Sequence, residues 1–172
     1  MKRLIILIPF IFSSCVTTNI TSNKAADFNE KISKLFITIR GSEKAKPFFN
    51  SFIKEVSDNL SQNGIPSKKH YFDPLSLETE KDVENKIADF GPNLIMVVNQ
   101  TESRNTVNVN NTGWGGYGTN TGGTFDVRIY KPGRENPVWR ASLKADSWSQ
   151  LSETAKKSSI LLLEKLTEDG LL

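Results

Sequence analysis

The sequence predicts an α/β (α+β) fold, a two-layer sandwich in which three helices cover one face of a mixed sheet of about five strands. Strand-like segments alternate with segments of helical spacing, in the order strand, helix, strand, helix, three strands and a final helix. The chain has 172 residues, which is an ordinary length for a single domain.

The first half of the domain reads as two strand–helix units. Residues 35–39 are rich in β-branched and aromatic side chains, which is typical of a strand. Apolar residues then follow helical spacing over 44–63. Residues 65–73 read as an edge strand because of Pro66, and a capping-box pattern at 79–82 opens a helix that ends at Gly91.

The second half reads as three strands and a helix. Residues 94–98 form an unbroken apolar run that predicts a central strand, which continues in more polar form to Val109. Residues 124–130 and 138–145 alternate strictly between apolar and polar side chains and predict a hairpin, with Trp139 in the core. The strongest helical pattern runs from about residue 148 to residue 167.

The amino-terminal segment resembles the signal peptide of bacterial lipoproteins. Lys2 and Arg3 precede an apolar run, and Phe12-Ser13-Ser14-Cys15 resembles a lipobox. The apolar run is about half of the ~20 residues that a membrane-spanning helix needs. We therefore expect a signal peptide at 1–14, a lipidated Cys15 with a flexible tether over 15–33, and a single α/β domain over 34–172.

The resemblance implies a location and an attachment. Cys15 would become the mature amino terminus and carry acyl chains such as palmitate, which hold a protein stably on a membrane once two are present. Val16 in place of Asp favours the outer membrane, and the lack of acidic residues just after it favours a periplasmic-facing domain. The alternatives are an unmodified buried thiol and an ordinary cleaved signal peptide.

Two further consequences follow from this segment. Cys15 is the only cysteine, so its lipidation would exclude disulfides, cysteine metal sites and a cysteine nucleophile. Cleavage would also remove Lys2 and Arg3 and lower the formal net charge from +3 toward neutrality. The charge therefore gives no reason to expect nucleic-acid binding.

Residues 110–123 are rich in glycine and asparagine and contain Trp114 and Tyr117. The segment lacks the Gly-Lys-Ser/Thr ending of a phosphate-binding loop and leads into a strand rather than a helix. It reads either as a mobile hairpin tip or as a contact loop. In the second case Trp114 and Tyr117 would bind a protein, stack on a sugar or lie at a membrane–water boundary.

A second resemblance covers the domain. Ile129-Tyr130, followed by Pro137-Val138-Trp139-Arg140-Ala141 and a terminal helix, is similar to small envelope lipoproteins of unknown function. The helix ending at Gly64 and the strand after it are more loosely similar to the α/β modules of curli-secretion lipoproteins and of the amino-terminal domain of the Tol–Pal propeller protein. This resemblance brings no catalytic residues.

These observations favour a lipid-anchored, non-catalytic envelope module that acts through contact with another protein. One alternative is a glycan or small-molecule binder that uses Trp114 and Tyr117. Another is a hydrolase built on carboxylates such as Asp73, Asp126 and Asp146, which nothing in the sequence pairs. The single histidine, His70, has no second histidine to complete a metal site. We therefore expect no enzyme activity, no cofactor and no metal.

Overall fold

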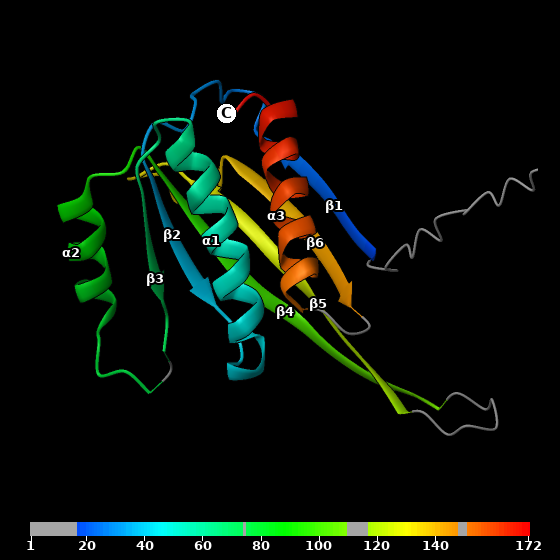
Figure 1. The fold of residues 1–172 in the computed structure, drawn as a ribbon. Coiled ribbons are helices and arrows are strands. Elements are labelled where there is room, and N and C mark those ends of the chain that lie inside the picture. Colours follow the sequence, from blue (N-terminus) through cyan, green and yellow to red (C-terminus); the bar gives the residue numbers. More distant parts are fainter. Residues whose placement is uncertain (1–16, 74, 110–116, 148–150) are drawn as a thin grey trace, which may run out of the picture.

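The computed structural model describes residues 17–73, 75–109, 117–147 and 151–172, and it confirms an α/β fold with a mixed sheet (Figure 1). In chain order its elements are β1 (Thr17–Lys24), β2 (Leu35–Arg40), a short 3-10 helix η1 (Glu43–Ala45), α1 (Lys46–Gln62), β3 (Ser67–Tyr71), α2 (Glu80–Phe90), β4 (Leu94–Val109), β5 (Tyr117–Tyr130), β6 (Trp139–Ser147) and α3 (Leu151–Glu168).

The sheet has six strands in the order β1-β6-β5-β4-β2-β3. β2 is parallel to both β3 and β4, whereas the β4–β5, β5–β6 and β6–β1 pairs are antiparallel. The parallel half contains the two helical crossovers, and the antiparallel half contains the predicted hairpin. The sixth strand is β1, which the sequence pattern did not predict.

The helices lie on both faces of the sheet rather than on one. α1 and α3 cross one face (Figure 1), where their apolar side chains share a core with Leu35, Ile37 and Ile39 of β2. α2 covers the opposite face, because Phe90 packs against Phe36 with ring centroids 6.0 Å apart, and alternate residues of a strand point to opposite faces.

The order of the strands explains why α2 lies there. The chain moves from β2 outward to β3 and then back past β2 to β4. Crossovers between parallel strands are almost always right-handed, so reversing the direction of travel transfers the second connecting helix to the other face. The expectation of three helices on one face is therefore wrong for α2.

Residues 17–33 belong to the domain, so the predicted flexible tether is wrong for these residues. β1 pairs with β6 over its whole length, from Thr17 opposite Asp146 to Lys24 opposite Trp139. After β1 the chain is irregular, but Phe28 and Ile32 are each only 4% exposed. The Ile32 amide donates to the Leu171 carbonyl at 2.8 Å. The amino-terminal segment therefore completes the core beneath α3.

Asp169, the residue after α3, connects β1 to the rest of the domain through hydrogen bonds. Its Oδ2 accepts hydrogen bonds from Ser22 Oγ at 2.6 Å and from the indole nitrogen of the buried Trp139 at 2.7 Å. Burial acts to raise the pKa of Asp169, but these two hydrogen bonds and the nearby Lys165 and Lys24 outweigh it, so the pKa is lowered.

We expect Asp169→Ala to lower the free energy of unfolding by about 2 kcal/mol at neutral pH, because a buried indole donor loses a charged acceptor. A carboxyl with a lowered pKa stabilises the fold above its unfolded pKa, and this contribution is lost as pH falls through the folded value. The difference between wild type and variant, measured by urea unfolding, should therefore shrink as the solution is acidified below pH ~4.

Glu168→Ala is the matched control, because Glu168 is the exposed neighbour of Asp169 and accepts a hydrogen bond from Lys165. We expect it to change stability by no more than about 0.5 kcal/mol. An Asp169→Ala variant as stable as the control at neutral pH would show that this carboxylate does not hold β1.

Candidate functional site

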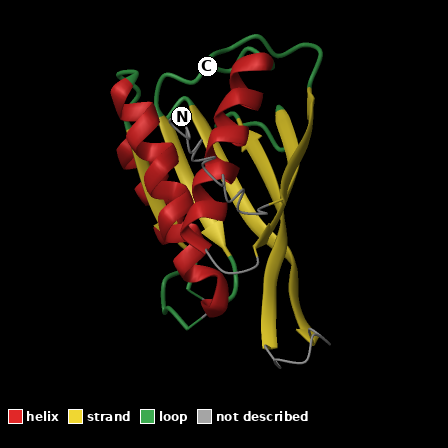
Figure 2. Cartoon of the chain, turned by 45° about the vertical axis from the view of Figure 1, so that its right-hand side comes forward, coloured by secondary structure: helices red, strands yellow, loops and turns green. Residues whose placement is uncertain are grey.

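The feature that stands out from the domain is a long hairpin arm formed by β4 and β5. The strands pair from Ile95 opposite Tyr130 out to Val109 opposite Tyr117. In the part of the chain that the structure describes, β6 accompanies β5 only as far as Thr121, which lies opposite Ser147. Beyond that point the arm is a two-stranded ribbon that projects past the sheet (Figures 1 and 2). We use "arm" for residues 102–109 and 117–123.

A β-bulge marks the base of the arm. The register of β4 against β5 shifts between Gln100 and Glu102, so that Thr101 is an extra residue. Thr101 Oγ1 donates to the Thr124 carbonyl at 3.1 Å. Bulges bend a strand and increase its twist, and this one lies where the ribbon begins to leave the sheet.

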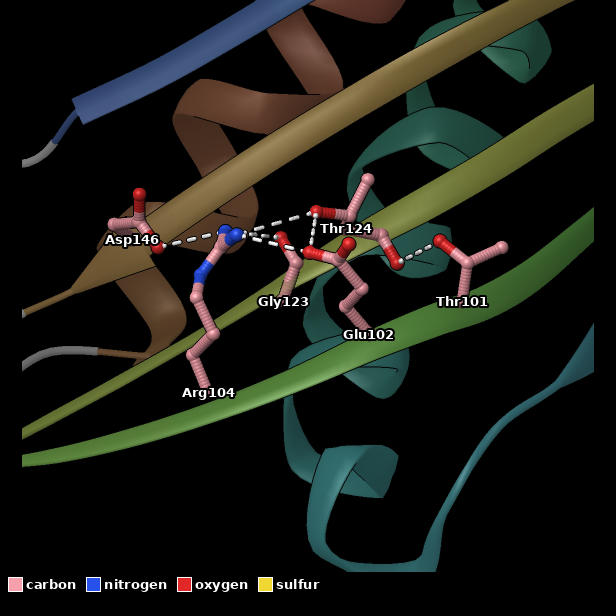
Figure 3. Close-up of polar contacts among 6 residues, drawn as sticks. All are labelled: Thr101, Glu102, Arg104, Gly123, Thr124 and Asp146. Atoms are coloured by element: carbon pink, nitrogen blue, oxygen red, sulfur yellow. Dashed lines mark hydrogen bonds and ion pairs between the residues drawn. The ribbon is translucent and has the colours of Figure 1, made fainter.

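Arg104 connects three strands at this base (Figure 3). Its Nη2 donates to Asp146 Oδ1 of β6 at 3.0 Å, and its Nη1 donates to Glu102 Oε2 of β4 at 3.1 Å. Thr124 Oγ1 of β5 donates to the same Glu102 oxygen at 3.0 Å. The guanidinium lies only one residue pair before the two-stranded section begins, so it fixes the direction in which the arm leaves.

Two glycines make this close packing possible. A Cβ atom at Gly122 would overlap the Asp146 carboxylate and lie 3.0 Å from the Ala145 carbonyl oxygen. A Cβ atom at Gly123 would lie 3.1 Å from both the Glu102 carbonyl oxygen and the Phe125 ring. Part of the glycine richness of residues 110–123 therefore has a packing reason, and residues 117–123 belong to β5 rather than to a loop.

The arm is supported from the core side by an aromatic cluster. Phe125 lies directly after the base, and its ring stacks on Phe48 of α1 with centroids 4.7 Å apart and an interplanar angle of 3°. Phe49 meets the same ring edge-on at 5.3 Å. The first turns of α1 therefore hold β5 in place just before it leaves the sheet.

The opposite face of the antiparallel half carries an ion-pair cluster around one buried carboxylate. Asp126 is only 6% exposed, and its two carboxylate oxygens accept from Arg128 Nε and Arg140 Nε, each at 2.6 Å. The alternation at 124–130 places Asp126 on the polar face of its strand, where a solvent-facing side chain is the simplest expectation, and that expectation is wrong. Arginine pairing on both sides compensates the burial of this carboxylate.

The sequence-predicted site residues fall into two groups. Cys15 and Trp114 lie outside the described residues. Tyr117 is the first residue of β5 and lies opposite Val109, at the far end of the described arm. The described part of the predicted contact segment, residues 117–123, therefore lies on the arm.

The carboxylates considered for catalysis are not brought together. Asp146 pairs with Arg104, Asp126 pairs with Arg128 and Arg140, and Asp73 accepts from the Leu75 amide in a turn. On β6, Asp146 lies four residues beyond Ser142, the partner of Asp126, which is about 13 Å along the strand. No cluster of three or more potential metal ligands occurs among the residues that the structure describes.

His70 lies beside a cleft between α2 and the sheet. Its Nε2 is 3.2 Å from Glu78 Oε2, and Glu78 also contacts Lys86. The cleft lining includes Thr38, Val83, Ile87 and Val97.

Within the described ranges, no helix is both long enough and apolar enough to cross a membrane.

The sequence did not single out Arg104, Glu102 or Gly122 as parts of a site. One signal was available, because no charged residue occurs between Arg104 and Asp126. The Glu102–Arg104 pair is therefore the last charge before a long uncharged stretch. Its pairing with Asp146, distant in sequence, required the register of three strands.

Comparison with known proteins gives a fold match only. No protein-family model matches the sequence, and no curated protein matches it. The structure is similar to PelC from Paraburkholderia phytofirmans, described as a dodecamer, with 14% identity, a TM-score of 0.53, and coverage of 85% of this chain and 95% of that one. A point variant of PelC gives 16% identity, a TM-score of 0.51, and coverage of 86% and 95%.

Solved structures named as lipoproteins are also matched. Lipoprotein GNA1162 from Neisseria meningitidis is 10% identical, with a TM-score of 0.47 and coverage of 79% of this chain and 99% of that one. A minor lipoprotein from Acinetobacter baumannii is 10% identical, with a TM-score of 0.41 and coverage of 81% and 95%. At the identities found for PelC, the likeness shows that this chain and PelC share a fold.

We expect Arg104→Ala to loosen the arm without unfolding the domain. The loss of a part-exposed, charge-assisted contact is worth about 1 kcal/mol, which corresponds to roughly fivefold faster local opening. Amide hydrogen exchange should therefore speed up at 105–109 and 117–121 but not at 94–98, which lie in the central part of the sheet.

Lys144→Ala is the matched control, because Lys144 is exposed on the same strand as Asp146. We expect this variant to exchange like the wild type throughout the arm. Unchanged exchange in Arg104→Ala would show that backbone pairing alone fixes the arm.

Proposed function

We propose that this protein is a lipid-anchored, non-catalytic module of the bacterial envelope that presents its arm to a protein partner. The observation that carries the proposal is the construction of the arm. β4 and β5 continue well beyond β6, and the ion pairs of Arg104 and the packing of Phe125 stiffen their base. A projection that is already ordered loses less conformational entropy on binding than a flexible loop does.

Two further observations support contact rather than chemistry. The carboxylates of Asp126 and Asp146 are occupied by arginines, which leaves neither as a free acid or base. The fold is also that of PelC, which is described as a dodecamer, so a domain of this shape is compatible with assembly.

The lipobox-like segment supports anchoring at Cys15, with the outer membrane and a periplasmic-facing domain as the proposed location.

The proposed contact is tested by photo-crosslinking in cells from Tyr117, replaced by a photoreactive amino acid. We expect a specific protein adduct from position 117, and from position 114 in the same segment, but none from Glu84, an exposed residue of α2. Adducts no stronger than those from Glu84 would contradict the proposal. Quenching of tryptophan fluorescence by an envelope saccharide, lost in Trp114→Ala, would instead favour a glycan binder.

The proposed anchor is tested separately. We expect Cys15→Ser to abolish metabolic labelling with radioactive palmitate and to release the protein from the membrane fraction, because no other cysteine can carry the thioether-linked lipid. The released protein should keep its urea-unfolding midpoint. Continued palmitate labelling of the variant would contradict the assignment of Cys15 as the lipidated residue.

A further inference from the structure

The start of β1 and the base of the arm lie in the same row of the sheet. Thr17 is opposite Asp146, Asp146 is opposite Gly122, and Gly122 is opposite Arg104. β1 extended toward its amino terminus and β4 extended toward its carboxyl terminus run in the same direction from this row. Both therefore leave the sheet at the same end (Figure 1).

This shared row limits the distance between the domain and a lipid on Cys15. Only two residue steps separate Cys15 from Thr17, and two extended residues span at most about 7 Å. The arm continues for five more residues of β4 beyond Arg104, to Val109, which is about 17 Å along a strand. The described arm therefore extends farther from this row of residues than Cys15 can lie from it.

The composition of the arm fits a position at a membrane surface. No charged residue occurs between Arg104 and Asp126, although charged residues make up 24% of the chain. Bringing this stretch into the headgroup layer therefore desolvates no charge. The stretch is rich in Asn, Thr and Gly rather than in large aliphatic residues, so it is poorly suited to burial in the hydrocarbon core, where unpaired polar groups are costly.

The backbone of the arm favours a protein over lipid as the occupant. β2 pairs with β4 only as far as Asn99, and β6 pairs with β5 only from Thr121 onward. Within the described residues, each strand of the ribbon therefore has one edge without a partner strand. Free strand edges bind another strand through main-chain hydrogen bonds.

We infer that the arm meets its protein partner at the surface of the membrane that holds Cys15, so that the partner is itself embedded in that membrane. The inference rests on the proposed lipid anchor and the proposed arm contact. It adds the orientation of the domain: the arm points toward the bilayer, and the turn between β5 and β6 points away from it.

The orientation is tested by energy transfer from a fluorescent donor to a headgroup acceptor in vesicles that carry the acylated protein. Asn108→Cys places the donor on the arm, and Glu135→Cys places it on the exposed β5–β6 turn at the other end of the sheet. A lipidated Cys15 leaves the introduced thiol as the only reactive one. We expect several-fold greater transfer from position 108, and equal or greater transfer from position 135 would overturn the inference.

The partner class is tested by releasing the protein captured from position 117 with a cleavable photoreactive group. We expect the released partner to resist extraction by alkaline carbonate, as an integral membrane protein does. A partner that carbonate extracts would overturn this inference and leave the arm-contact proposal standing. Greater transfer from position 108 with no protein adduct would identify lipid as the occupant and would overturn both the partner class and the arm-contact proposal.

A spacer variant tests whether height above the membrane matters. A rigid helical spacer of about 20 residues between Cys15 and Thr17 would lift the domain by about 30 Å. We expect it to reduce the adduct from position 117 several-fold, whereas a Gly/Ser spacer of equal length, which lets the domain return to the surface, should reduce it less. Equal adducts from both variants and the wild type would overturn the inference.

Discussion

The pairing of β1 with β6 is the constraint on which the rest of the structure depends. It places the first described residues at the edge of the sheet and brings Ser22 within reach of Asp169. The same carboxylate satisfies the indole of Trp139, one of the largest buried side chains. The Asp169 carboxylate, directly after α3, thus connects β1 with β6.

Most elements could be predicted because their signals are local. The alternation at 124–130 and 138–145 and the helical spacing at 44–63 survive in β5, β6 and α1. The capping box at Thr79 is present, with Thr79 and Asp82 bonding each other's backbone amides. When one face of a strand or one stripe of a helix is buried, apolar residues recur with the period of that element, and this recurrence can be recognised in the sequence.

The features that could not be predicted are strands and side chains whose pairing or burial depends on residues distant in the sequence. β1 has the sequence Thr-Thr-Asn-Ile-Thr-Ser-Asn-Lys, which resembles a polar linker and becomes a strand because β6 offers it an edge. Asp126 is buried by two arginines, one of them from the neighbouring strand. The base of the arm needs Asp146 opposite Gly122, which no local pattern contains. The face that α2 covers follows from strand order.

The bulge at Thr101 restricts how the arm can change in length during evolution. Deleting the extra residue would leave Gln100 opposite Phe125 and Glu102 opposite Thr124 as consecutive pairs of a regular ladder, and it would remove the bend and extra twist at the base of the arm. A single insertion between 102 and 109, on one strand alone, would shift the residues beyond it by one position against β5. Related proteins should therefore lengthen or shorten the paired part of this ribbon by equal numbers of residues on both strands, while its base stays constant in length.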